Sequence, residues 1–172
     1  THGGPKILEI NSRPGDPESI NLFPILKDDF VDLCYKMIEG NLNRVEVEKS
    51  ATVLTYKVPP SYGGYAEVHP KSPNLSEAQT PIDLSAAYAL TRKYGDKIRI
   101  YPGSMELRNN SNFALKSRVV GVLGIGEDIE AARLISQEGA KIIKGGGLWN
   151  RTDIASKSHI AKSVQHMKQL RA

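Results

Sequence analysis

Lys6-Ile-Leu-Glu-Ile-Asn-Ser-Arg-Pro-Gly-Asp-Pro-Glu18 joins a short apolar stretch to a polar, proline-containing loop. We expect residues 5–11 to form a short buried strand and the rest to form a stiff loop. Side chains alternate along a strand, so Glu9, Asn11 and Arg13 would share one face. Their oxygen atoms suit Mg²⁺, and a guanidinium pairs with phosphate oxygens. The same alternation is also typical of a strand with one solvated face, so the residues alone leave both interpretations open.

The composition limits the class of protein. Of the 172 residues, 40% are hydrophobic and 24% are charged, and the formal net charge is +4. Basic residues are scattered among acidic ones, whereas a nucleic-acid-binding protein carries a dense basic patch with exposed aromatic residues. No apolar run reaches the roughly 18 residues that a membrane span needs. We expect no nucleic-acid or membrane partner. The single cysteine, Cys34, fits the reducing cytoplasm and a small buried hydrophobe rather than a nucleophile.

Hydrophobic periodicity predicts the remaining elements. An amphipathic helix is expected at residues 24–39, with a buried face of Leu26, Phe30, Leu33, Cys34, Met37 and Ile38. In chain order, the further expected elements are a strand at 51–58, a surface loop at 68–81, a short helix at 84–94, strands at 97–101, 104–108, 113–117 and 119–125, and a second amphipathic helix at 128–143. This second helix would bury Ile129, Ala132, Ile135, Ala140 and Ile143.

The hydrophobic pattern changes from period 3.6 to period two near residue 49, which indicates a domain boundary. We therefore expect an α+β protein divided into residues 1–48, a small β-rich domain with one packed helix at 49–156, and a polar, helical tail at 157–172.

Two glycine-rich runs elsewhere could be taken for phosphate-binding loops. Gly121-Val-Leu-Gly-Ile-Gly126 precedes a helix, but it lacks the order of a dinucleotide-binding loop, so a tight turn with Asp128 at the helix N-cap is the better interpretation. Residues 145–147 are expected to end the helix at 128–143. The four histidines have no metal-like spacing, and Trp149 is expected to anchor a loop onto the core.

Residues Leu8 to Glu18 closely resemble the final catalytic motif of the phosphoribosylamine–glycine ligases, which are ATP-grasp enzymes of purine biosynthesis with the pattern L-E-[FY]-N-x-R-F-G-D-P-E. Other segments resemble further family patterns: Phe23 to Leu33, Gly63-Gly64-Tyr65, Ile100 to Ser104, Arg118 to Ile143, and Arg151-Thr-Asp-Ile154. The resemblance covers about residues 4–156. It implies that residues 1–48 are the last strand and helix of an ATP-grasp core.

The resemblance also implies the cofactors. Glu9 and Asn11 would be ligands of Mg²⁺, or of Mn²⁺, that bridges the phosphates of ATP. Leu8 and Arg13 would contact the bound nucleotide, and Arg13 would also act in catalysis by binding the transferred phosphoryl group.

The reaction of the family involves two further residues. ATP phosphorylates the carboxylate of glycine, and the amine of 5-phosphoribosylamine attacks the glycyl phosphate to give glycinamide ribonucleotide, ADP and phosphate. Asp16 and Glu18 would be catalytic residues on the acceptor side.

The N-terminal part of such a ligase would be a partner that this chain needs, so we expect the chain alone to be inactive. Two alternatives are an ATP-grasp ligase with another amine acceptor and a non-catalytic β-rich binding or assembly module.

Overall fold

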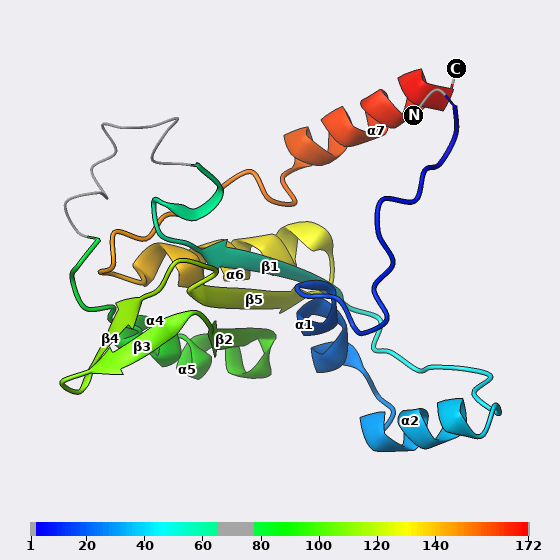
Figure 1. The fold of residues 1–172 in the computed structure, drawn as a ribbon, viewed down its shortest axis with the longest axis horizontal. Helices are drawn as coiled ribbons and strands as arrows, with labels where there is room; N and C mark the ends of the chain where they lie inside the picture. The colour runs from blue at the N-terminus through cyan, green and yellow to red at the C-terminus, as the bar shows by residue number, and fades with distance from the viewer. Residues whose placement is uncertain (1–2, 65–77, 172) are drawn as a thin grey trace.

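The computed structural model describes residues 3–64 and 78–171. It is an α+β structure, as expected (Figure 1). The helices are α1 (Glu18–Leu22), η1 (Phe23–Ile25), α2 (Phe30–Ile38), η2 (Tyr62–Gly64), α4 (Ser85–Ala89), α5 (Thr91–Tyr94), η4 (Gly95–Lys97), α6 (Ile129–Ile142) and α7 (Lys157–Arg171). The strands are β1 (Ala51–Lys57), β2 (Ile98–Pro102), β3 (Met105–Arg108), β4 (Ser111–Ala114) and β5 (Val120–Gly126). Most of the expected loop at 68–81, and Tyr65 of the glycine-containing turn, lie outside the described residues.

Strand β5 is the centre of a three-stranded antiparallel sheet with the order β1-β5-β2. Its side chains are buried on both faces, which explains why its sequence is almost continuously apolar. Strands β3 and β4 form a separate hairpin. Asn109 and Asn110 join them with φ of +46° and +61°, a conformation that asparagine tolerates better than most residues and that matches strand twist.

Helix α6 covers one face of this sheet (Figure 1). Its buried residues are Ala132, Ile135, Ser136, Gly139 and Ala140. Asp128 caps the helix, since its Oδ1 accepts a hydrogen bond of 2.8 Å from Ala131 N. The run 121–126 is thus a strand-to-helix turn, as expected. The prediction that Ile129 is buried is wrong: it is the first residue of α6 and is 49% exposed.

The other face of the sheet carries Leu54 and Tyr56, which alternate with the residues that face α6. Among the described residues no helix as long as α6 covers this face, although the short helix α1 contacts β1. Pro17 and neighbouring parts of the N-terminal loop lie against it instead. This arrangement brings the segment that opens the chain onto the sheet.

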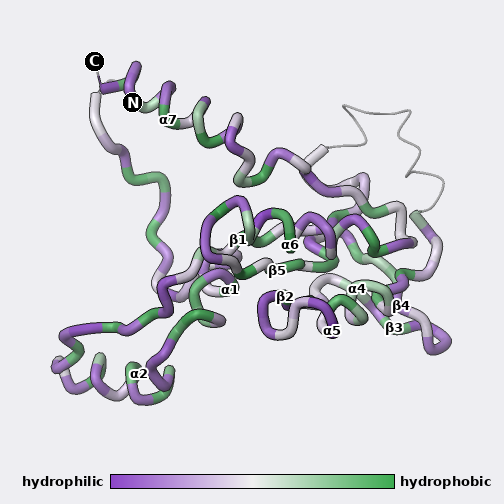
Figure 2. The backbone as a smooth tube through the Cα atoms, turned by 180° about the vertical axis from the view of Figure 1, so that it is seen from behind, coloured by the Kyte–Doolittle hydropathy of each residue, from purple (hydrophilic) through white to green (hydrophobic). Residues whose placement is uncertain are grey.

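The expected strand at residues 5–11 is not formed. The segment is extended, but it has no strand partner among the described residues, and Leu8 and Ile10 are 96% and 85% exposed. Figure 1 shows it running away from the sheet towards the end of α7, and Figure 2 shows hydrophobic stretches along it. A strand requires hydrogen-bonding neighbours, so the sequence pattern is insufficient without one.

The helix expected at 24–39 is also shorter in the structure. Asp29 has an extended backbone, and its carboxylate accepts hydrogen bonds from Val31 N and Asp32 N, so α2 begins at Phe30. Residues Phe23–Ile25 form the short helix η1 instead. Of the expected buried face, Leu33 is buried and Cys34 is half-buried, whereas Phe30, Met37 and Ile38 are exposed. The apolar face is present in the sequence, but the described residues cover it only in part, at Leu33 and where the ring of Phe23 contacts Phe30.

The other elements agree closely with the predictions. Strand β4 begins at Ser111 rather than 113, because a two-residue turn ends at Asn110. The helix at 84–94 is divided into α4 and α5 and ends at Gly95, whose φ is +56°. The polar helix of the tail is α7. None of the helices at 3–64 and 78–171 is long and apolar enough to cross a bilayer.

Candidate functional site

A polar cleft lies on the sheet face opposite α6. It has a volume of about 460 Å³ and is lined by Asp16 and Ile20, by residues 101–104 and 117–118, and by Tyr56 and Tyr62. Three of these segments belong to the motifs that the sequence resemblance identified. They are far apart in the chain, so the fold is what brings them together.

Arg118 links two other residues that line the cleft, Asp16 and Tyr62. Its Nη1 donates a hydrogen bond of 3.0 Å to the backbone oxygen of Asp16 and lies 3.1 Å from Asp16 Oδ1. Its Nε donates to the hydroxyl of Tyr62 at 3.2 Å. The hydrogen bond to Tyr62 and the negative charge of Asp16 raise the pKa of Arg118 further above its usual value. Arg118 therefore ties the N-terminal loop to the sheet as a permanent cation.

Tyr56 provides a second contact to the same loop. Its hydroxyl donates a hydrogen bond of 3.0 Å to Asp16 Oδ1. Burial of the ring, and then the hydrogen bond to Asp16, raise the pKa of Tyr56 to about 12. The guanidinium of Arg118 also lies 5.4 Å from the centre of the ring. Tyr56 is thus a neutral hydrogen-bond donor near pH 7.

The segment Ile100 to Ser104 closes one side of the cleft through its backbone. Gly103 N donates to Val119 O and Ser104 N donates to Arg118 O, both at 2.8 Å. A Cβ at Gly103 would lie 2.7 Å from the oxygen of Arg118, so only glycine permits this approach without a shift. These contacts fix the backbone of Arg118.

The predicted site residues fall into two groups. Asp16 lies in the cleft, and Glu18 begins α1 with its carboxylate folded towards Gly15. Glu9 and Asn11 lie together on the extended segment, where Asn11 Nδ2 donates a hydrogen bond of 3.0 Å to Glu9 Oε1.

Arg13 and Leu8 lie outside the cleft. Arg13 Nη1 donates to Pro14 O at 2.9 Å, and the side chain of Leu8 is exposed. No described contact joins Glu9 or Asn11 to Asp16. Within 3–64 and 78–171 there is no cluster of three or more histidine, cysteine, aspartate or glutamate side chains suited to a metal. The roles in metal and nucleotide binding stay predictions.

The sequence does not identify Tyr56, Tyr62 or Arg118 as site residues, although all three line the cleft. The sequence contains a partial signal for Tyr56, because it alternates with the apolar side of β1 and must face the opposite side of the sheet. Arg118 lies two residues before the buried strand β5, but its partner Asp16 is 102 residues away. Local periodicity does not reveal such a contact.

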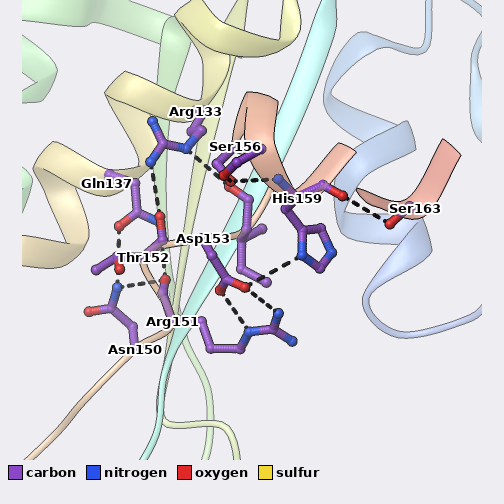
Figure 3. Close-up of polar contacts among 11 residues, drawn as sticks. Arg133, Gln137, Asn150, Arg151, Thr152, Asp153, Ser156, His159 and Ser163 are labelled. Atoms are coloured by element: carbon purple, nitrogen blue, oxygen red, sulfur yellow. Dashed lines mark hydrogen bonds and ion pairs between the residues drawn. The ribbon is translucent and has the colours of Figure 1, made fainter. Parts of the chain in front are cut away.

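The closing motif, Arg151 to Ile154, has a structural role (Figure 3). The guanidinium of Arg151 donates to both carboxylate oxygens of Asp153, at 2.9 and 2.7 Å, and this pairing lowers the pKa of Asp153 to about 2. Arg133 of α6 donates to Thr152 O at 2.9 Å and to Ile154 O at 3.2 Å. These contacts connect α6 to the start of α7.

Replacing Arg118 by methionine should destabilise the chain by about 1–3 kcal/mol, because several hydrogen bonds to a charged group are lost at a partly buried position. Urea unfolding followed by circular dichroism measures the loss. The matched control is Arg108→Met, which removes an exposed ion pair with Glu106 and should cost less than about 1 kcal/mol. Equal losses in the two variants would contradict the anchoring role.

The α+β fold, with a charged loop fixed on one face of its sheet, is compatible with the C-terminal part of an ATP-grasp protein, the class that the motifs indicate. Comparison with curated proteins gives a more specific result. Over 99% of its length, the chain is 36% identical to the phosphoribosylamine–glycine ligase of Methanococcus maripaludis strain C7 and 37% identical to that of Methanocaldococcus jannaschii. The corresponding ligase of Methanosarcina barkeri strain Fusaro is 34% identical over 173 residues.

These matches confirm the resemblance that the motifs predicted, and they extend it over nearly the whole chain. The chain spans 35–36% of the length of these relatives, which is consistent with a C-terminal part. No family model matches the chain.

Proposed function

We propose that the chain is the C-terminal part of an ATP-dependent ligase that joins glycine to 5-phosphoribosylamine. The similarity to ligases of that name over 99% of the chain supports this function. The observation that carries the proposal is the convergence of three motifs on one cleft, through Asp16, residues 101–104 and Arg118. Segments that are separated in sequence and share one cleft are typical of a substrate site.

In this proposal Glu9 and Asn11 hold Mg²⁺. Their geometry fits the role, because the amide nitrogen of Asn11 donates to Glu9 Oε1, which leaves Asn11 Oδ1 and Glu9 Oε2 as oxygen donors on neighbouring side chains. Two protein ligands are sufficient for Mg²⁺ when substrate phosphates and water complete the coordination. When bound, the ion neutralises charge on the phosphates of ATP.

The chain's own residues position the reactants. Arg13, on the exposed loop, binds the phosphoryl group as it passes from ATP to the carboxylate oxygen of glycine. The amine of phosphoribosylamine then forms the new C–N bond, and phosphate leaves. Asp16 and Glu18 accept hydrogen bonds from this amine. Asp16 is preorganised by Tyr56 and Arg118, so its orientation is set before the substrate arrives.

The exposed apolar residues of the N-terminal part support a larger assembly. Residues 5–11 would pair as a strand with the preceding ATP-grasp core, and the face of α2 that carries Phe30 and Ile38 would pack on that core. Both regions are exposed here. In the complete protein, residues 1–48 would be the end of the core, 49–156 the C-terminal domain and 157–172 the tail. Such an enzyme would work in the cytoplasm.

Reconstitution tests the proposal. The chain is expressed with the N-terminal two-thirds of the Methanocaldococcus jannaschii ligase, and phosphate release is measured with ATP, Mg²⁺, glycine and phosphoribosylamine. We expect release that depends on glycine, on the acceptor and on both chains. Activity with another amine only would identify a different acceptor. A stable complex without nucleotide-dependent phosphate release would favour the non-catalytic module.

A further inference from the structure

Lys57 is a buried lysine on the sheet face covered by α6, on the side of the sheet away from the proposed active site. It is the last residue of β1 and shares a face with Val53 and Thr55. Its residue surface is only 7% exposed. A lysine is rarely buried to this extent unless its ammonium is paired.

Lys57 has no such pair in the part of the chain that the structure describes. No carboxylate at 3–64 or 78–171 lies within ion-pair distance of its ammonium, and no hydrogen bond of its side chain is found there. Burial alone lowers the pKa of Lys57, with no neighbouring charge to oppose the effect. The ammonium is therefore partly desolvated with no charged partner among the described residues, and an anion beside it would provide that partner.

A surface cavity of about 680 Å³ opens at this lysine. Its wall is rigid, because Gln137 donates hydrogen bonds to Thr55 Oγ1 at 3.0 Å and to Arg151 O at 3.2 Å, while Asn150 donates to Gln137 Oε1 at 3.3 Å (Figure 3). These amide donors are already used within the protein. They shape the cavity, and the lysine side chains of its lining, Lys57 and Lys141, are the donors that a ligand could still use.

The charge of the cavity lining favours an anion. Lys141 is a second cation on it, at the exposed end of α6. The lining contains one carboxylate, Glu138, which is already neutralised: Lys93 Nζ lies 2.9 Å from its Oε1, and the hydroxyl of Tyr94 donates to its Oε2 at 2.6 Å. Lys57 and Lys141 therefore remain to attract a ligand.

The same lining also has an apolar part. Leu134 is 57% exposed on α6, and Tyr94 forms another part of the wall. A small inorganic ion would leave these side chains uncovered, whereas an organic anion would contact them with its body.

We propose that this cavity is a binding site for a small organic anion, whose carboxylate or phosphate group pairs with Lys57 and Lys141 and whose apolar portion lies on Leu134 and Tyr94. The proposal is independent of the ligase function, because the cavity and the proposed active site lie on opposite faces of the sheet.

Titration of the 172-residue chain with benzoate, phenyl phosphate and inorganic phosphate tests the site, with benzyl alcohol as the neutral control. Binding is measured by calorimetry and by amide chemical shifts. We expect saturable binding of benzoate or phenyl phosphate, weaker binding of inorganic phosphate and none of the alcohol. The shifts should cluster at residues 137–141 and 150–152. The two aromatic probes distinguish a carboxylate site from a phosphate site.

Lys57→Gln should weaken binding of the aromatic anions about tenfold or more, because a charge-assisted hydrogen bond at a buried position is lost. Lys49→Gln makes the same charge change at an exposed residue two positions before β1 and should leave binding unchanged. Lys141→Gln changes an exposed residue, so it should fold normally and weaken binding several-fold even if Lys57→Gln does not fold. No saturable binding, equal binding of benzyl alcohol, or unchanged binding in Lys141→Gln would overturn the proposal.

Discussion

Replacing Glu9 and Asn11 together by alanine should lower the phosphate-release rate of the reconstituted ligase by about 100-fold or more, because an unshielded phosphate charge in the transition state costs several kcal/mol. The two side chains lie within hydrogen-bond distance of each other on the extended segment, so the double replacement would remove both ligands of one proposed metal site. The rate is measured at saturating glycine over a range of Mg²⁺ concentrations. The single variant Asn11→Ala should be partly restored by high Mg²⁺, since Glu9 remains.

Ser12→Ala is the control for this experiment, because Ser12 lies between Asn11 and Arg13 on the same exposed segment. It should retain a rate close to that of the unchanged protein. A normal rate in the double variant at low Mg²⁺ would exclude the metal role of Glu9 and Asn11. If Ser12→Ala lowers the phosphate-release rate as much as the double variant does, any change in the segment disturbs assembly, and loss of the two metal ligands is not the cause.

The central strand and its helix could be predicted from sequence because their information is local. The run at 119–125 is apolar almost throughout, as a strand buried on both faces must be, and Asp128 stands at the position of an N-cap. The asparagine pair at 109–110 is similarly typical of a tight hairpin turn, and both residues have positive φ. In each case neighbouring residues are sufficient to specify the element.

The opening segment, residues 5–11, shows that a local sequence pattern does not predict contacts with distant residues. Its alternation is that of a strand, and Asn11 does lie on the same side as Glu9, yet no described strand pairs with residues 5–11. The strand depends on a partner that the pattern cannot supply. Likewise, the cleft depends on contacts between Asp16 and two residues 40 and 102 positions away, Tyr56 and Arg118. The motifs predicted that Asp16 matters, and the fold was needed to identify what holds it.

Gly124→Ala should be the most destabilising single substitution in the sheet, with a loss of about 3 kcal/mol or more. A Cβ at this position would overlap the backbone oxygen of Ala132 and lie 2.7 Å from the backbone nitrogen of Ser136. Both atoms belong to α6, whose backbone cannot move locally, so the whole helix would have to shift away from the core. Urea unfolding followed by circular dichroism gives the change in the free energy of unfolding.

Gly121→Ala is the matched control, because it adds the same methyl group to the same strand on the opposite face. There a Cβ would lie 3.1 Å from Cε1 of Tyr56 and 3.3 Å from Cδ1 of Leu54, and both are side-chain atoms that can adjust by a few tenths of an ångström. Its loss should be about 1 kcal/mol or less. Equal stabilities of the two variants would show that α6 does not pack on β5 through the backbone contact at Gly124. A large difference in the expected direction would establish that the close approach of α6 to the sheet requires a glycine there.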